Sequence, residues 1–335
     1  MAVVFMDGFD SYNGTTAPNG TLGRWAVGTT AAGVGTGRFG GQALLCASGS
    51  NSSLTSPSFT SVSSLTLGFS YQRGTNSNNT RPISLYSGAT EQVGFAFNTD
   101  GSITASRAGT ALGTTAAGLT VTNVWYTVEI EVVISDTVGR ITIYLDGVQV
   151  LNLTGQDTRN GAPTDVTNIR LGSHIGTTSQ TFIDDLYITD SATKPTNALR
   201  IETLVPNADG ATLNFTLSTG TSHFAVVDEL PANTTDYASG SAVGDLDELD
   251  LTNLSATPTA IEAVQVGAVW LKTDATARQM ALEVKSGATT STGSNYVLTT
   301  TGDKATRLLT TDPDTGAAWT ASAVNALKTR TKVTV

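Results

Sequence analysis

The chain has 335 residues, 14% of them charged and 34 of them glycine, and its formal net charge is −10. No stretch of the sequence is basic, so the composition argues against a nucleic-acid partner. Helix-favouring runs are scarce and turn residues are abundant, which is typical of an all-β protein long enough for about two domains.

The N-terminal residues MAVVFMDGFD carry no positive charge, and Asp7 interrupts their apolar run. We therefore expect no signal peptide and no membrane insertion, with synthesis in a host cytoplasm and no Sec export.

The single cysteine, Cys46, lies in the apolar run QALLCA and is predicted to be a buried small apolar residue. One cysteine also excludes an internal disulfide framework.

Short alternating runs recur through the first half of the chain, about every ten to fifteen residues, with turn residues between them. This spacing is typical of a β-sandwich or jelly roll. The predicted strands cover residues 3–5, 24–27, 42–46, 53–55, 65–71, 83–85, 93–97 and 103–105.

The clearest strands lie within residues 125–153. Apolar and polar side chains alternate along residues 126–134, and this period of two predicts a strand with one apolar face. Asp146 and Gly147 predict a type I′ hairpin turn, because both central residues of that turn need a positive φ. The turn is expected to pair Leu145 with Val148 and Ile143 with Val150.

The polar segment 191–198, SATKPTNA, is predicted to be a linker between a first domain, residues 1–190, and a smaller second β-sandwich, residues 199–335. Just before it, Asp184 and Asp185 interrupt the alternation of FIDDLYIT and predict a bulge or strand end. In the second half, Thr320 is predicted to cap one short helix. The predicted strands there include residues 199–204, 212–217, 224–227, 260–271, 280–284, 305–309 and 328–335.

Four stretches of the first half suggest a fold family. The N-terminal DGFD, the Trp125-Tyr126 strand opening, the LDGVQV hairpin and the strand FIDDLYI resemble laminin-G-like, or concanavalin A-like, jelly rolls. The resemblance covers residues 1–190 and implies that the last strand of this domain returns beside the first.

More narrowly, the layout is similar to a class of bacteriophage virion proteins. The aromatic first strand with DGFD, the second β-domain and the stretches RIETLVPNADG and TDPDTGAAWTASAVNAL carry this resemblance. It implies a structural protein of the tail, neck, fibre or capsid surface that is not an enzyme. The expected location is the virion, and the expected partners are other virion proteins and copies of the chain itself, in a homo-oligomer.

Two glutamates are the candidates for catalysis. A family of retaining glucanases with this fold carries E-[IL]-D-x-x-E on one strand, where two carboxyl groups about 5 Å apart act as nucleophile and acid/base. Glu129 matches the nucleophile, Glu131 replaces the intervening Asp, and Ile134 occupies the acid/base position. Because Ile134 carries no proton to donate, we predict no catalytic residue and expect both glutamates on a solvated strand face. A glycoside hydrolase is the third alternative.

The remaining polar candidates are histidines and acidic clusters. His174 and His223 lie in different predicted domains and in no triad signature. Two clusters could offer oxygen ligands to calcium, but neither has the spacing of an EF-hand loop. We therefore predict no metal and no cofactor, with solvated acids whose neighbours Leu246, Leu249 and Leu251 face the core. The clusters are Asp184 with Asp185, and Asp245, Asp247, Glu248 and Asp250.

Glycan binding is the alternative function from another class, as an adhesin or lectin-like module for a host-surface glycan. Such sites combine exposed aromatic rings with polar neighbours, although aromatic residues at alternating positions more often belong to a core. The candidates are Tyr12, Tyr71, Tyr86, Tyr144 and the loop at residues 75–81.

Overall fold

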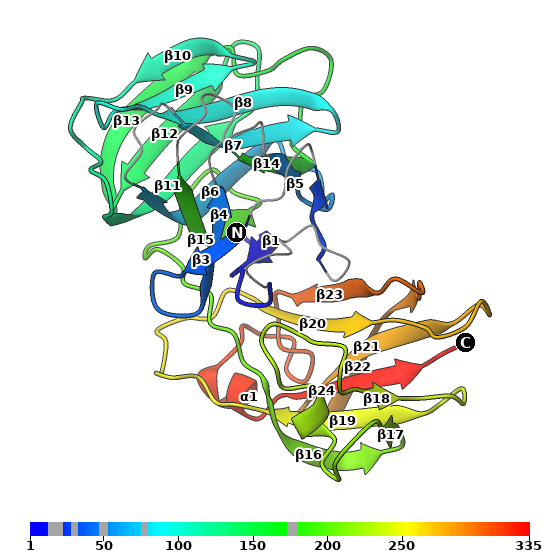
Figure 1. Ribbon diagram of the computed structural model, residues 1–335. Coiled ribbons are helices and arrows are strands. Elements are labelled where there is room, and N and C mark those ends of the chain that lie inside the picture. The colour runs from blue at the N-terminus through cyan, green and yellow to red at the C-terminus, as the bar shows by residue number, and fades with distance from the viewer. Residues whose placement is uncertain (13–22, 28–32, 47–52, 75–79, 173–179) are drawn as a thin grey trace. The chain divides into compact units, whose positions relative to one another are not determined.

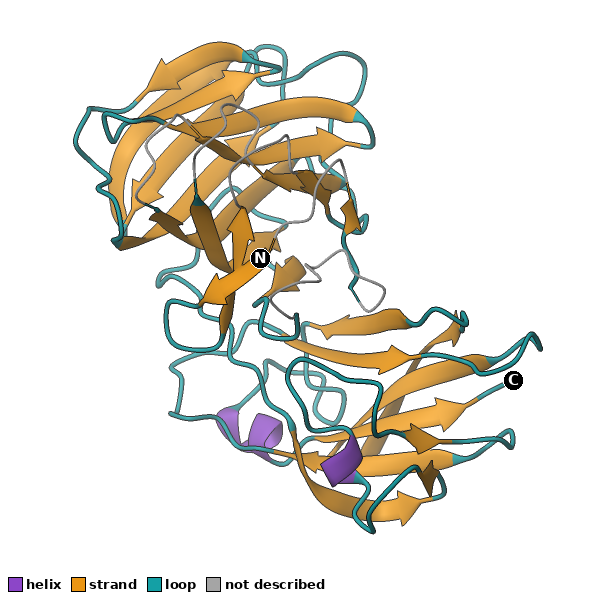
Figure 2. Ribbon diagram, viewed as in Figure 1, coloured by secondary structure: helices purple, strands orange, loops and turns teal. Residues whose placement is uncertain are grey.

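The computed structural model describes the chain apart from residues 13–22, 28–32, 47–52, 75–79 and 173–179 (Figure 1). Nearly all of its regular structure is β, so the predicted fold class is confirmed (Figure 2). The chain divides into two compact units, of which the first ends at Ile201 and the second runs from Glu202 to Val335.

The first unit is a sandwich of two antiparallel sheets. Within the described residues, the larger sheet, here the first sheet, consists of β1 (Val3–Asp7), β3 (Gly33–Thr36), β4 (Gln42–Cys46), β6 (Ser64–Arg73), β11 (Trp125–Val133), β12 (Gly139–Leu145), β13 (Val148–Gln156) and β15 (Thr181–Thr189). Their order is β13-β12-β11-β6-β15-β4-β3, and β1 also pairs with β15. The last strand of the unit thus returns beside the first, as the jelly-roll resemblance implied.

The second sheet lies against the first. Its described strands are β2 (Ala26–Val27), β5 (Ser53–Thr55), β7 (Thr80–Ser87), β8 (Thr90–Phe97), β9 (Ile103–Arg107), β10 (Thr110–Thr114) and β14 (Asn168–Gly172). Their order is β10-β9-β8-β7-β14-β5-β2, with every pair antiparallel.

The inner faces of the two sheets form one apolar core. Phe69 of β6 and Ile130 of β11 are fully buried there, and Tyr71 and Phe97 place their ring centroids 3.9 Å apart. Burying such a side chain contributes roughly 1.5–3 kcal/mol, so the alternating residues supply most of the drive to fold. Cys46 is also fully buried as predicted, and burial raises the pKa of its thiol to about 12.

The central hairpin has the predicted turn but a different register beyond it. Asp146 and Gly147 have φ values of 47° and 80°, and Leu145 pairs with Val148. A bulge between Ile143 and Tyr144 then adds one residue to β13. Ile143 consequently faces Leu151, and the predicted pairing with Val150 is wrong.

The DGFD motif builds the N-terminal corner of the first unit. The carboxylate of Asp7 is buried and accepts hydrogen bonds from the Tyr12 hydroxyl at 2.7 Å and the Trp25 indole at 2.8 Å. A Cβ at Gly8 would lie 2.8 Å from the side chain of Ile201, so the glycine leaves room for that residue. The residues of the DGFD motif therefore hold this corner of the fold together.

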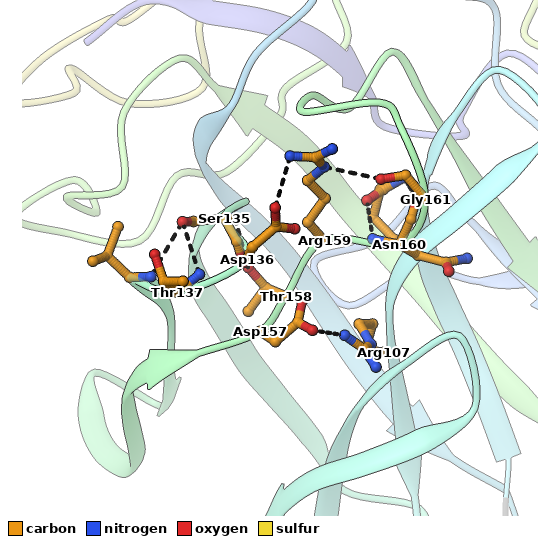
Figure 3. A network of polar contacts seen from close by, with 11 residues as sticks. Arg107, Ser135, Asp136, Thr137, Asp157, Thr158, Arg159, Asn160 and Gly161 are labelled. Atoms are coloured by element: carbon orange, nitrogen blue, oxygen red, sulfur yellow. Dashed lines mark hydrogen bonds and ion pairs between the residues drawn. The ribbon is translucent and has the colours of Figure 1, made fainter.

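The polar loop after β13 joins the two sheets. Thr158 is fully buried and accepts the backbone N–H of Ser135 at 3.0 Å, while the backbone N–H of Asn160 donates to Gln92 of β8 at 2.8 Å. Figure 3 shows two ion pairs beside this loop, Arg159 with Asp136 and Arg107 with Asp157. The loop therefore closes this end of the sandwich.

The second unit contains one larger sheet and two strand pairs within the residues that the structure describes. The larger sheet has the order β16-β19-β24-β21-β22, and the pairs are β17-β18 and β20-β23. The elements are β16 (Pro206–Leu213), β17 (Thr216–Leu217), η1 (Phe224–Val226), β18 (Ala238–Ser239), β19 (Leu246–Leu251), β20 (Val264–Trp270), β21 (Gln279–Ser286), β22 (Thr289–Val297), β23 (Asp303–Leu309), α1 (Ala321–Asn325) and β24 (Lys328–Val333).

The second unit has its own core, in which Leu282, Val284 and Trp319 are buried. Thr320 caps α1 as predicted, accepting the backbone N–H of Ala323 at 3.1 Å. The strands predicted at residues 199–204 and 224–227 are wrong: the former is irregular and the latter forms the 3₁₀ helix η1. The N–H of Phe224 donates to the side chain of Asp209 instead of to a neighbouring strand.

Candidate functional site

The first sheet carries a buried polar cluster on its outer face, the face turned away from the core. Glu129 and Glu131 alternate with the core residues of β11 and therefore point outward. They are only 1% and 6% exposed. The prediction that they lie on a solvated face is therefore wrong, because other parts of the chain cover them.

Each glutamate has partners that balance its charge. The Tyr187 hydroxyl donates to Glu129 Oε1 at 2.9 Å, and the Lys194 ammonium lies 2.9 Å from Oε2, which accepts no aligned hydrogen bond from the described part of the chain. The backbone N–H of Lys194 donates to Glu131 at 3.0 Å, and Arg140 lies 3.5 Å from its other oxygen. The cluster thus contains two carboxylates, Glu129 and Glu131, and two cations, Lys194 and Arg140.

Gly68 makes this arrangement possible. It lies between Glu129 and Tyr187 in the strand register, and a Cβ at this position would lie 2.0 Å from the Tyr187 ring. The ring therefore crosses β6 directly above the glycine backbone. Burial, followed by the charge of Glu129, raises the pKa of the Tyr187 hydroxyl well above its ordinary value.

Residues 191–201, here the covering segment, lie over the cluster. Ser191 accepts a hydrogen bond from Thr66 at 2.7 Å, Ala192 accepts one from Arg140, and the N–H of Ile201 donates to Asp185 at 2.8 Å. The residues predicted to be a linker are thus packed against the first sheet. A substrate would reach the carboxylates only after this segment left the sheet.

Asp184 and Asp185 form the predicted bulge in β15, where the register against β6 shifts and Asp185 has a φ of 50°. Asp184 accepts the backbone N–H of Arg38 at 2.9 Å. Burial, followed by the charge of Asp185, raises the pKa of Asp184 to about 7. Burial likewise raises the pKa of Asp185.

The predicted acid/base position contributes no proton donor, because Ile134 belongs to the apolar core. His174 lies outside the described residues. In the second unit, His223 Nδ1 lies 2.6 Å from Asp247, whose other oxygen accepts the N–H groups of Asn214 and Phe215. This buried carboxylate thus holds residues 214–215, which follow β16, and His223, which precedes η1.

The acidic run of β19 also differs from its prediction. Glu248 is 2% exposed and has Lys285 and Arg330 as neighbours. Asp245, just before the strand, accepts two backbone N–H groups. Asp250 pairs with Lys328. Asp247 and Glu248 are therefore buried, whereas the prediction had them solvated. In the part of the chain that the structure describes, no group of three His, Cys, Asp or Glu is placed to hold a metal ion.

Of the four candidate tyrosines, three are buried. Tyr12 and Tyr71 belong to the core and Tyr86 bonds to Glu91, whereas half-buried Tyr144 has the Lys194 ammonium 5.4 Å from its ring centroid. Residues 75–79 of the candidate loop lie outside the described residues. Thr80 and Arg81, the end of that loop, begin β7.

Sequence reasoning missed an aromatic pair on the outer face of the first sheet. Trp125 and Phe182 are half-buried, with ring centroids 6.3 Å apart, and Gln72 lies between them in the strand register. Beside them, Arg38 donates to Thr127 at 2.5 Å and to Ser70 at 3.3 Å. The signal for the pair was the alternation that places Trp125 on the same face as Glu129.

No family model and no curated protein matches the chain. Solved structures match part of it: a sialidase (TM-score 0.42, 12% identity, 56% of this chain and 18% of that one), an endo-β-1,4-glucuronan lyase from Trichoderma reesei (0.38, 16%, 56% and 99%) and the carbohydrate recognition domain of Emp46p (0.36, 10%, 50% and 88%). At these identities the likeness concerns the fold alone. The matched structures are carbohydrate-binding or carbohydrate-processing β-sandwich proteins.

These matches correct one prediction. The expectation that the protein is not an enzyme is contradicted, because two of the structures that match part of the chain, the sialidase and the lyase, are enzymes. None of the three names is that of a phage protein, so the phage resemblance stays a prediction.

Among the described residues, no helix is long and apolar enough to cross a membrane.

Proposed function

We propose that the protein is a structural component of a bacteriophage particle and works by assembly with neighbouring subunits. The observation that carries this proposal is a set of exposed valines at one end of the first sheet. Val121, Val124 and Val148, here the valine patch, are 51%, 42% and 65% exposed. The N–H of Asp146 donates to the carbonyl of Thr127 at 2.8 Å, which ties the β12–β13 hairpin to the start of β11.

Exposed valines suit contact with another protein, because an interface removes their apolar surface from water. The carboxylate face of the same sheet is covered by the chain's own segment, whereas the valines stay exposed. The expected partners are other virion proteins and copies of this chain, through interfaces of about 800 Å² on each side. The resemblance of both halves to virion proteins supports the same function and a location in the virion.

Mass spectrometry of gradient-purified particles tests the proposal. We expect the protein in the particles at a fixed ratio to the capsid protein. Its absence from particles, with the free protein in the host cytoplasm, would contradict the proposal.

Val148→Asp is expected to lower incorporation into particles at least tenfold, because a carboxylate in an apolar contact must be desolvated without a partner. The isolated protein should keep its stability, since the side chain is exposed. Val138→Asp is the matched control: Val138 is 71% exposed but lies in the β11–β12 turn, at the opposite end of the sheet. Equal incorporation of the two variants into particles would show that the valine patch is not part of the interface.

A second candidate function, glycan binding, is favoured by the Trp125–Phe182 pair. Half-buried aromatic rings beside Gln72 and Thr127 combine an apolar surface with hydrogen-bonding groups, the combination that a sugar ring contacts. This function is compatible with assembly, because a virion component can also contact a host-surface glycan.

Trp125→Ala is expected to weaken retention on an immobilised glycan about tenfold or more, since loss of one aromatic contact costs on the order of 1.5 kcal/mol. Retention is measured on a glycan array, with Tyr237→Ala as control, because Tyr237 is an exposed aromatic residue of the second unit. Equal retention of both variants, or none by the unaltered protein, would argue against this candidate.

A further inference from the structure

The turn between β3 and β4 presents an aromatic ring to solvent. Phe39, at the centre of residues 37–41, is 54% exposed. The guanidinium carbon of Arg38 lies 5.1 Å from its ring centroid, and that of Arg200, near the end of the covering segment, lies 4.7 Å from it. Residues 37–41 and Arg200, here the arginine tip, thus combine one exposed ring with two cations.

Two carboxylates hold the turn of the arginine tip in shape. Asp184 accepts the backbone N–H of Arg38 at 2.9 Å, and Asp10 accepts the backbone N–H of Gln42 at 2.8 Å. Phe39 is therefore presented by a turn that is already ordered. Burying its ring in an interface would cost little further ordering of the backbone.

The two cations of the arginine tip keep their charge available to a partner. Within the described residues, neither of them forms an ion pair. The Arg38 guanidinium donates to the hydroxyls of Thr127 and Ser70, which carry no charge. The buried carboxylate beneath them, Asp185, accepts the Ser70 hydroxyl and the N–H of Ile201. The tip is thus a positive site on a protein whose net charge is −10.

The second unit carries a surface of the opposite charge. Residues 227–237, between η1 and β18 and here the acidic loop, contain Asp228, Glu229 and Asp236 and no lysine or arginine. Burial, followed by the charges of Asp236 and Asp228, raises the pKa of Glu229, so the three carboxyl groups lie near one another. In the part of the chain that the structure describes, none of the three has a cation as partner.

Exposed apolar side chains adjoin these acids. Leu230 follows Glu229 and Tyr237 follows Asp236 in the sequence, and the two apolar residues are 44% and 51% exposed. The side chains of Glu229 and Asp236 reach each other, which brings the two halves of the loop together. The acidic loop therefore offers apolar surface and negative charge, the complement of the arginine tip.

We propose that the arginine tip of one copy of the chain binds the acidic loop of a neighbouring copy. Opposite charges align the two surfaces, and the ring of Phe39 loses its contact with water against Leu230 and Tyr237. The two surfaces differ, so the contact is head-to-tail and its repetition gives a ring or a filament. This inference rests on the assembly function proposed above and names a partner and two surfaces for it.

Sedimentation velocity of the purified full-length protein tests the contact at low and at high salt. We expect self-association that grows with protein concentration and weakens as salt screens the charges. A protein that stays monomeric at low salt would overturn the inference. That failure is distinct from failure of the assembly function, which is decided by whether purified particles contain the protein.

Two charge-reversed variants assign the contact to these surfaces. Arg200→Glu and Asp228→Lys should each lower the association constant about tenfold or more, because each brings like charges together. An equal mixture of the two variants should associate again. In the mixture the reversed tip meets the reversed loop, and the unaltered loop of the first variant meets the unaltered tip of the second. Arg200 is exposed, so its replacement should leave folding intact.

Two further variants complete the test. Phe39→Ser keeps every charge and should also weaken association, because it removes the apolar part of the contact. Arg107→Glu is the matched control: it reverses a cation of the first unit that pairs with Asp157, and it should associate like the unaltered protein. Unchanged association in Arg200→Glu and Phe39→Ser, or no recovery in the mixture, would overturn the assignment.

Discussion

Replacing Lys194 by methionine is expected to lower the free energy of unfolding of the first unit by about 3 kcal/mol. Methionine fills a similar space but carries no charge. Glu129, which is 1% exposed, would then keep a buried carboxylate without the ammonium now 2.9 Å from it. Urea denaturation of the full chain measures the difference.

Two controls separate this effect from general damage. Arg159→Met removes an exposed ion pair with Asp136 in the same unit and should cost less than about 1 kcal/mol. The double variant Lys194→Met with Glu129→Gln should recover stability, because the buried charge is gone. If Lys194→Met cost no more than Arg159→Met, the ion pair would not be what holds the covering segment on the sheet.

Asp184→Asn is expected to flatten the pH dependence of stability by on the order of 3 kcal/mol between pH 4 and pH 8. Burial, followed by the charge of Asp185, raises the pKa of Asp184 from 3.8 to about 7 in the folded protein. Between these values the folded state holds a proton that the unfolded state has lost. The favourable contribution of Asp184 is therefore complete below about pH 4 and is lost as the pH rises through about 7.

The test compares the free energy of unfolding of three proteins across this pH range. Asp184→Asn should lose stability less steeply with rising pH than the unaltered protein. Asp136→Asn, at an exposed carboxylate, should follow the unaltered protein. Parallel curves for Asp184→Asn and the unaltered protein would show that Asp184 does not bind a proton near neutral pH.

Period-two alternation predicted the first unit well. It identified the core positions of β6, β8 and β11, and the dipeptide Asp146-Gly147 identified its turn, because both signals depend on residues close together in the chain. The bulge that pairs Ile143 with Leu151 left no comparable signal, since one extra residue is specified by contacts across the hairpin. Residues 224–227 were misread for a similar reason: the N–H of Phe224 is taken by the side chain of Asp209, on another element.

The candidate site was less accessible to prediction. Alternation placed Glu129 correctly on the outer face but predicted water around it, whereas Tyr187 and Lys194, from distant parts of the sequence, cover it. The pairing of Arg81 with Glu91 across Gly94 had no sequence signal, because a side chain that crosses a neighbouring strand leaves no periodic pattern.

The sequence by itself determined that this protein is all-β and which apolar side chains of the first unit leave water, because strand geometry alternates the two faces and apolar burial selects one of them. Only the tertiary structure decided what lies on the other faces. It placed residues 191–201 over Glu129 and Glu131, and it stacked Arg170 of β14 on the ring of Tyr86 of β7. Periodicity reports the direction in which a side chain points, whereas its partners there come from strands and segments that only the folded chain brings near.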